Sequence, residues 1–180
     1  MSRTLTQTEL ERLTAADWRD RLADAPGLWV SVSDQRVLLI QGEQVLFEAP
    51  CSTARNGVGC EEGSYKTPVG WHLINAKIGA DAPWGQVFRA REATPEIWQP
   101  DRETPDDLIL TRILTLRGVQ PGINLGGTHD TLARYIYIHG TNWEQDIGRP
   151  VSHGCIRMRN DDIIALFDQV EEETPVLITP

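Results

Sequence analysis

The sequence has no excess of positive charge and no long apolar run. Its 180 residues include 17 lysines and arginines against 26 aspartates and glutamates, a net charge of −9. Such a chain lacks the basic face that nucleic-acid phosphates require, which excludes nucleic acid as a partner. Residues 37–40 form one of the longest apolar runs. A membrane helix needs about 20 apolar residues, so membrane insertion is excluded as well.

Cysteine is also scarce. Cys51, Cys60 and Cys155 are too few, and odd in number, for a disulfide framework. A bridge between Cys51 and Cys60 would need an oxidising compartment, and two reduced thiols are the favoured interpretation. No apolar stretch follows a basic start at the N-terminus, so the sequence indicates no secretory signal. We expect a cytoplasmic protein, or a periplasmic one if a leader has been removed.

The length predicts one domain with a short extension, since a typical domain has about 150 residues. In residues 1–27, Thr6 with Glu9 and Thr14 with Asp17 form two potential capping boxes, which predict two short helices. Apolar residues fall roughly on one helical face of this segment: Leu10, Leu13, Trp18 and Leu22. We expect a helical N-terminal extension over 1–27 that packs on a catalytic domain over 28–180.

From residue 28 onward the apolar pattern changes to a period of two. Residues 29–33, 36–40 and 44–47 predict a three-stranded meander, and further strands are predicted at 71–74, 109–117, 134–138 and 175–178. A capping cluster at 160–162 predicts one more helix. The chain has no alternation of strands and helices, and no dinucleotide- or phosphate-binding motif. It therefore predicts a mostly β domain with a few short helices.

Residues 79–107 contain four prolines and two tryptophans. This composition predicts a long irregular segment, which is either a lid over a substrate or a solvated insertion.

Reactive side chains concentrate in residues 139–141 and 152–157. Cys155 lies sixteen residues after His139, and a cysteine nucleophile needs a nearby imidazole because an isolated thiol is mostly protonated at neutral pH. It also needs backbone N–H groups directed at the developing oxyanion. Glycine permits a close approach of backbone to substrate, so the N–H groups of Gly154 and Cys155 are natural donors. Arg157 would either bind a substrate carboxylate or pair with an acidic neighbour.

The string from Ser152 to Arg157, preceded by His139 and Gly140, resembles the signature of the L,D-transpeptidase catalytic domain family (YkuD-like). The resemblance continues upstream in residues 52–54, 57–59 and 64–70 and covers about 28–179. It implies a β-sandwich or barrel, a cysteine acyl-transfer site and no cofactor. The implied substrates are peptidoglycan stem peptides or released muropeptides.

The resemblance also implies roles. Cys155 would attack the carbonyl of the third stem residue, a diamino acid, and expel the terminal D-Ala. His139 would act as base and then acid, with its tautomer held by the Gly140 carbonyl. His153 would line the site, and its N–H would join those of Gly154 and Cys155 in the oxyanion hole. The thioester would pass to water, as in muropeptide recycling, or to an amine, as in cross-linking.

Several alternatives remain at the sequence level. His153 could be the base in place of His139. Substrate contacts are expected from Arg157, Ser152 and Thr141, although the Ser152 hydroxyl could instead stabilise the turn. His72 and His129 are expected to be packing or surface residues.

A zinc site formed by the two imidazoles and the thiol is the main rival hypothesis, but the paired ligand spacings of structural zinc are missing. We therefore expect no metal. A silent peptide-binding module is a further alternative, and papain-like or caspase-like proteases are disfavoured because their cysteine signatures are absent.

Overall fold

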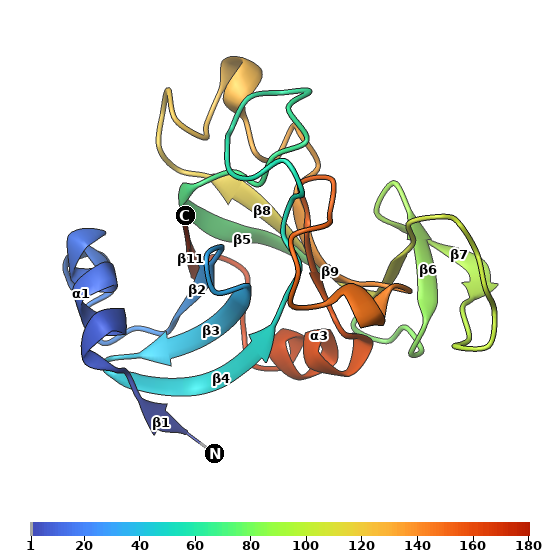
Figure 1. Cartoon of the computed structure of the whole chain (residues 1–180), viewed down its shortest axis with the longest axis horizontal. Helices are drawn as coiled ribbons and strands as arrows, with labels where there is room; N and C mark the ends of the chain where they lie inside the picture. The colour runs from blue at the N-terminus through green and yellow to red at the C-terminus, as the bar shows by residue number, and fades with distance from the viewer. Residues whose placement is uncertain (1) are drawn as a thin grey trace.

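The computed structural model describes residues 2–180 and consists mainly of β-strands, as predicted (Figure 1). The strands are β1 (Arg3–Thr4), β2 (Gly27–Ser31), β3 (Arg36–Gln41), β4 (Gln44–Pro50), β5 (Gly70–Ile78), β6 (Gln86–Arg89), β7 (Glu92–Ile97), β8 (Ile109–Gly118), β9 (Tyr137–Gly140), β10 (Ile156–Met158) and β11 (Pro175–Thr179). The helices are α1 (Gln7–Ala15), α2 (Trp18–Leu22) and α3 (Asn160–Phe167), with 3₁₀ turns at Gly127–His129 and Glu144–Asp146. No helix within residues 2–180 is long and apolar enough to cross a membrane.

The strands form one sheet that closes on itself. Its order is β1-β4-β3-β2-β11-β5-β8-β6-β7, while β9 pairs with β8 and β10 pairs in parallel with β9. Beyond the end of β4, Ser52 and Arg157 exchange two backbone hydrogen bonds of 2.8 and 2.9 Å. This bridge joins the chain after β4 to β10 and so completes a barrel. The mostly β fold is confirmed, and of the β-sandwich or barrel that the resemblance implied, the structure has the barrel.

Strand β2 is buried on both faces because the sheet carries two apolar cores. One face packs Leu28 and Val30 with the inner residues of β8–β10 and with α3. The other face packs Trp29 with the side chains of α1 and α2. A strand covered on both faces needs a continuous apolar sequence, which is what residues 28–30 provide.

The N-terminal extension differs in part from the prediction. The capping box of Thr6 and Glu9 is present at the start of α1. The second box is wrong: Thr14 lies inside α1, and Asp17 precedes α2 in a left-handed conformation (φ 57°) without a side-chain cap. The extension also contributes a strand, since β1 pairs with β4.

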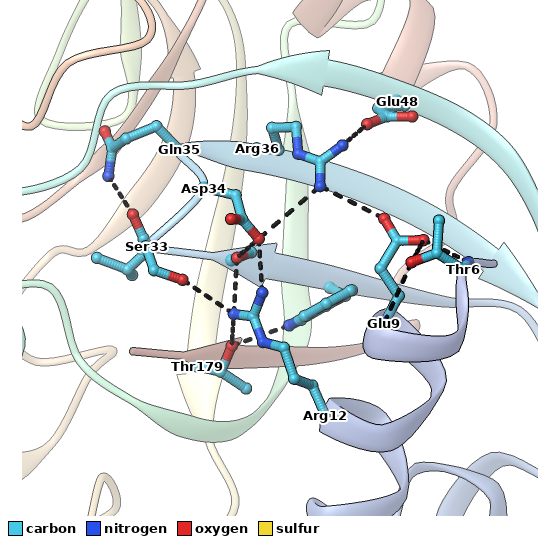
Figure 2. Close-up of polar contacts among 12 residues, drawn as sticks. Thr6, Glu9, Arg12, Ser33, Asp34, Gln35, Arg36, Glu48 and Thr179 are labelled. Atoms are coloured by element: carbon cyan, nitrogen blue, oxygen red, sulfur yellow. Dashed lines mark hydrogen bonds and ion pairs between the residues drawn. The ribbon is translucent and has the colours of Figure 1, made fainter.

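Ion pairs fasten this extension to the sheet (Figure 2). Glu9 is nearly buried, and its carboxylate accepts hydrogen bonds of 2.8 and 2.9 Å from the guanidinium of Arg3. Arg36 on β3 contacts the same carboxylate at 3.4 Å and also pairs with Glu48 on β4. Arg12 of α1 pairs with Asp34 at 2.5 Å. The network therefore links α1 to β3, β4 and the turn before β3.

Two other predicted segments need correction. Residues 79–107 are not irregular throughout, because β6 and β7 form a hairpin that extends at the end of the molecule opposite α1 (Figure 1). The strand predicted at 134–138 begins only at Tyr137, since Tyr135 has a left-handed conformation (φ 58°) that ends a turn. Helix α3 begins at 160 as predicted, but the Asn160 side chain bonds Thr141 and Glu144 instead of capping the helix.

Candidate active site

The nucleophile candidate lies at the start of the parallel pair β9–β10. Ile156 is paired with Ile138, and both are buried in the first core. Side chains alternate along a strand, so Cys155 and His139 lie on the opposite face of the pair. The backbone N–H of Tyr137 donates to the Cys155 sulfur at 3.3 Å, which places the sulfur beside β9. Sequence positions sixteen residues apart are thus brought onto one face of adjacent strands.

His139 is buried with a defined tautomer. Its Nδ1 lies 2.6 Å from the Gly140 carbonyl oxygen. A carbonyl only accepts, so Nδ1 carries the proton and Nε2 is left as the basic nitrogen. Gly140 is required here, because a Cβ would lie 2.5 Å from the Asn160 Oδ1 and 2.6 Å from the Leu110 carbonyl oxygen. Close packing of β8, β9 and α3 therefore fixes the imidazole.

Burial shifts the pKa of the thiol and the pKa of the imidazole in opposite directions. Burial raises the pKa of the Cys155 thiol, and the charge of Asp107 adds to the shift. The Tyr137 N–H and the charges of Arg157 and Arg134 oppose it. Burial likewise lowers the pKa of His139, against the effect of the Gly140 carbonyl. Among residues 2–180, the sulfur is hydrogen-bonded to the backbone of Tyr135 and Tyr137 and to neither imidazole.

The turn before the nucleophile is held by hydroxyl groups. Ser152 Oγ donates to the Cys155 carbonyl at 2.6 Å and accepts the N–H of Gly154 at 3.2 Å. Thr67 Oγ1 donates to the Gly154 carbonyl at 2.9 Å. Gly154 has φ +130°, a conformation that a side chain would strain. The N–H of Gly154, expected to face an oxyanion, is therefore engaged inside the turn.

Two residues expected to touch substrate are instead buried. Thr141 has no exposed surface, and its hydroxyl accepts the N–H of Trp143 at 3.1 Å. Ser152 is 1% exposed and shapes the turn, which was the alternative noted for it. Neither side chain is accessible to a ligand, so the substrate-binding assignment is corrected for both.

Asp107 is a site residue that the sequence analysis missed. Its Oδ2 forms an ion pair with Arg157 Nη2 and lies 3.2 Å from His153 Nδ1. Arg157 is almost fully buried, with its guanidinium 5.2 Å from the centre of the Trp143 ring. The sequence signal was present: Arg157 was expected to meet a carboxylate, and an Asp pair precedes the strand at 109–117. Its acidic partner proves to be part of the chain.

The remaining histidines lie outside this cluster. His72 is fully buried, with Nδ1 3.0 Å from the Gly70 carbonyl and Nε2 3.0 Å from the Thr131 hydroxyl. His129 ends a 3₁₀ turn. Cys51 and Cys60 are free thiols. Within residues 2–180 no group of three His, Cys, Asp or Glu side chains is arranged to hold a metal ion.

A pocket of about 560 Å³ opens beside Trp143. It is lined by Trp98, Pro100, Arg102, Glu103, Thr104, Pro105, Asn142, Trp143 and Gln145. Asn142 and Trp143 follow directly on residues 139–141, so this hollow adjoins the segment that carries His139.

Comparison with known proteins decides the family. The YkuD model, described as the L,D-transpeptidase catalytic domain, matches residues 25–178. The chain belongs to this family. The "Probable L,D-transpeptidase ErfK/SrfK" of Salmonella typhimurium is 55% identical over 166 residues, which cover 85% of this chain and 52% of that protein. This L,D-transpeptidase-family chain thus spans about half the length of that relative, and less of several others.

Solved structures share the fold at low identity. The L,D-transpeptidase of Enterococcus faecium, solved as a Cys-to-Ser mutant, has 15% identity and a TM-score of 0.53, covering 99% of this chain and 66% of that one. L,D-transpeptidase 3 of Mycobacterium tuberculosis, solved with a faropenem-derived adduct, has 17% identity and a TM-score of 0.53, with coverage of 87% and 61%. These likenesses support the mostly β architecture of the family.

Proposed function

We propose that this chain is a cysteine acyl-transfer enzyme that cleaves the bond between the diamino acid and the terminal D-Ala of peptidoglycan stem tetrapeptides. The observation that carries the proposal is the placement of the Cys155 sulfur at the β9 backbone, on the same face as the buried His139 whose Nε2 is basic. Membership of the L,D-transpeptidase family supports the substrate class.

The first half-reaction forms a thioester. His139 Nε2 takes the thiol proton as the sulfur attacks the carbonyl carbon, and the same proton then passes to the nitrogen of the departing D-Ala. This order of steps starts from a neutral thiol and a neutral imidazole. The surroundings that disfavour a resting thiolate also disfavour a resting imidazolium.

The developing oxyanion needs backbone donors. Since Ser152 occupies the Gly154 N–H, the N–H groups of His153 and Cys155 remain, and neither has a partner within residues 2–180. They are the donors that we propose for the oxyanion hole, where each well-placed N–H contributes about 3 kcal/mol of transition-state stabilisation.

The second half-reaction passes the acyl group to an acceptor. With water the product is a tripeptide, and with an amine it is an exchanged or cross-linked peptide. Both outcomes proceed through one thioester, so the chemistry at Cys155 is common to a carboxypeptidase and a transpeptidase.

Mass spectrometry of reactions with a disaccharide-tetrapeptide, with and without a free D-amino acid, tests this proposal. Cys155→Ala and His139→Ala should abolish D-Ala release, whereas the control His129→Ala should retain it. Tripeptide alone indicates hydrolysis, and an exchanged terminal residue indicates transfer. Imipenem should add one covalent equivalent to the wild-type protein and none to Cys155→Ala. Full turnover by Cys155→Ala would refute the proposal.

A further inference from the structure

Asp107 occupies a defined position beside the nucleophile turn. The side chain of Asn142 fixes the backbone on both sides of it: Asn142 Oδ1 accepts the N–H of Leu108 at 3.0 Å, and its Nδ2 donates to the Asp106 carbonyl at 3.0 Å. The carboxylate thus held pairs with buried Arg157 and meets the imidazole of His153. His153, from the turn before Cys155, and Arg157, from β10, thus meet at one carboxylate oxygen of Asp107.

The contacts of His153 Nδ1 select one tautomer. A carboxylate only accepts hydrogen bonds, so Asp107 Oδ2 at 3.2 Å requires a proton on Nδ1. Arg157 Nη2 lies 3.5 Å from the same nitrogen and would require the opposite tautomer. The carboxylate is closer, and Arg157 Nη2 already donates to Asp107. The geometry therefore favours Nδ1–H, which leaves Nε2 basic.

The two imidazoles of the site then share a tautomer but differ in exposure. His139 is 3% exposed and is held by the Gly140 carbonyl. The His153 side chain is 63% exposed, with Asp107 and Arg157 at Nδ1 and the Tyr65 ring edge-on at 6.5 Å. A base that removes a proton from an acceptor arriving through solvent must be accessible, and His153 meets that condition better than His139.

We propose that Asp107 is a positioning residue for the second half-reaction, which it serves by holding His153 with Nε2 directed to the acceptor. The inference rests on the proposed function. The acceptor's lone pair attacks the thioester carbonyl as its proton moves to His153 Nε2. The carbon–sulfur bond then breaks, and the released thiolate regains a proton through solvent. Formation of the thioester depends on His139 and does not require Asp107.

The test separates the two half-reactions. For Asp107→Ala we expect imipenem acylation within about twofold of wild type, and turnover of tetrapeptide lower by at least about tenfold. Asp107→Asn keeps an oxygen acceptor for His153 and should retain most of the turnover. Asp106→Ala is the matched control, because only the backbone of Asp106 is engaged by Asn142. A merely structural role would slow acylation and turnover together.

Removing the carboxylate leaves the Arg157 charge buried without its partner, so Asp107→Ala could fail to fold. A second measurement uses the wild-type protein: nitrogen-15 NMR of the His153 imidazole, assigned with His153→Gln, at a pH where the ring is neutral. The Nδ1–H tautomer is expected. The Nε2–H tautomer, or a folded Asp107→Ala with undiminished turnover, would overturn the inference. A wild-type protein that imipenem does not acylate would instead contradict the proposed function.

Discussion

Replacing Glu9 by glutamine tests how the N-terminal extension is held on the barrel (Figure 2). Hydrogen bonds from Arg3 lower the pKa of Glu9 from 4.5 to about 2, against the opposing effect of burial. The difference between these two pKa values corresponds to about 3 kcal/mol in favour of the ionised carboxylate in the folded state. Arg3 is one third exposed, and solvent screening reduces the expected contribution to about 2 kcal/mol. The amide oxygen of glutamine can keep the capping box with Thr6, while its NH2 replaces the oxygen that accepts from Arg3 Nη2 and Arg36. The substitution therefore removes the charge and one of the two acceptors that Arg3 uses.

The effect of the Glu9 carboxylate on the free energy of unfolding depends on pH. The folded pKa lies below the unfolded one, so the carboxylate's contribution is complete above pH 4.5 and is lost as the pH falls toward 2. Urea unfolding of wild type and Glu9→Gln should differ by about 2 kcal/mol at neutral pH and converge near the folded pKa. Glu11→Gln is the control on the same helix, where Gln7 is the only partner of the carboxylate among residues 2–180. This account would be refuted if the difference in free energy of unfolding between wild type and Glu9→Gln did not change with pH, or if Glu11→Gln lost as much stability.

Three further predictions follow from local geometry. Gly154→Ala should lose most acylation by imipenem, because a methyl group would strain φ +130° and lie 3.1 Å from Ile136; undiminished acylation would contradict the strain argument. His72 is kept neutral by burial, which lowers its pKa from 6.5 to about 4, so wild-type stability should fall as the pH drops through this window. In urea unfolding at several pH values, the free energy of unfolding of His72→Gln should depend less on pH between 6.5 and 4 than that of wild type. An unchanged pH dependence would exclude His72 as its source. Arg91→Ala removes the 2.7 Å bond from the hairpin turn to the Tyr137 hydroxyl and should accelerate hydrogen exchange in β6–β7; equal exchange rates would show that the tether is unimportant.

The sequence predicted the elements whose signal is local. Strands β2–β4 followed from short apolar segments and the turns between them, although β2 and β3 are buried on both faces and do not alternate. The start of α1 followed from Thr6 and Glu9. The β6–β7 hairpin was missed because prolines masked its short strands, one of which contains Pro95. The start of β9 was misplaced because Tyr135 adopts a left-handed conformation that its residue type does not announce.

The site was predictable as a set of residues but not as a set of contacts. The motif around Cys155 predicted which imidazoles and glycines would gather. It could not show that Ser152 binds the Gly154 N–H, because that bond depends on how a four-residue turn closes. Asp107 was missed for another reason: it lies 50 residues from Arg157, and no periodicity relates the two. The charge of Arg157 predicts an acidic partner, but it does not select one among the chain's aspartates and glutamates.

The site lies where regular strands end and single bonds complete the barrel. Ser52 joins the chain after β4 to Arg157 through two backbone bonds, and its hydroxyl donates to the Arg149 carbonyl at 2.5 Å. Thr67 reaches across to the Gly154 carbonyl. Each of these bonds fixes the backbone of a single turn. A continuous ladder of strand hydrogen bonds would instead fix the conformation of all the residues along it. The turn before Cys155 thereby holds Gly154 at φ +130°, which glycine adopts without strain, while the strand pair that carries His139 stays regular. One barrel therefore holds both an unusual turn and a fixed imidazole.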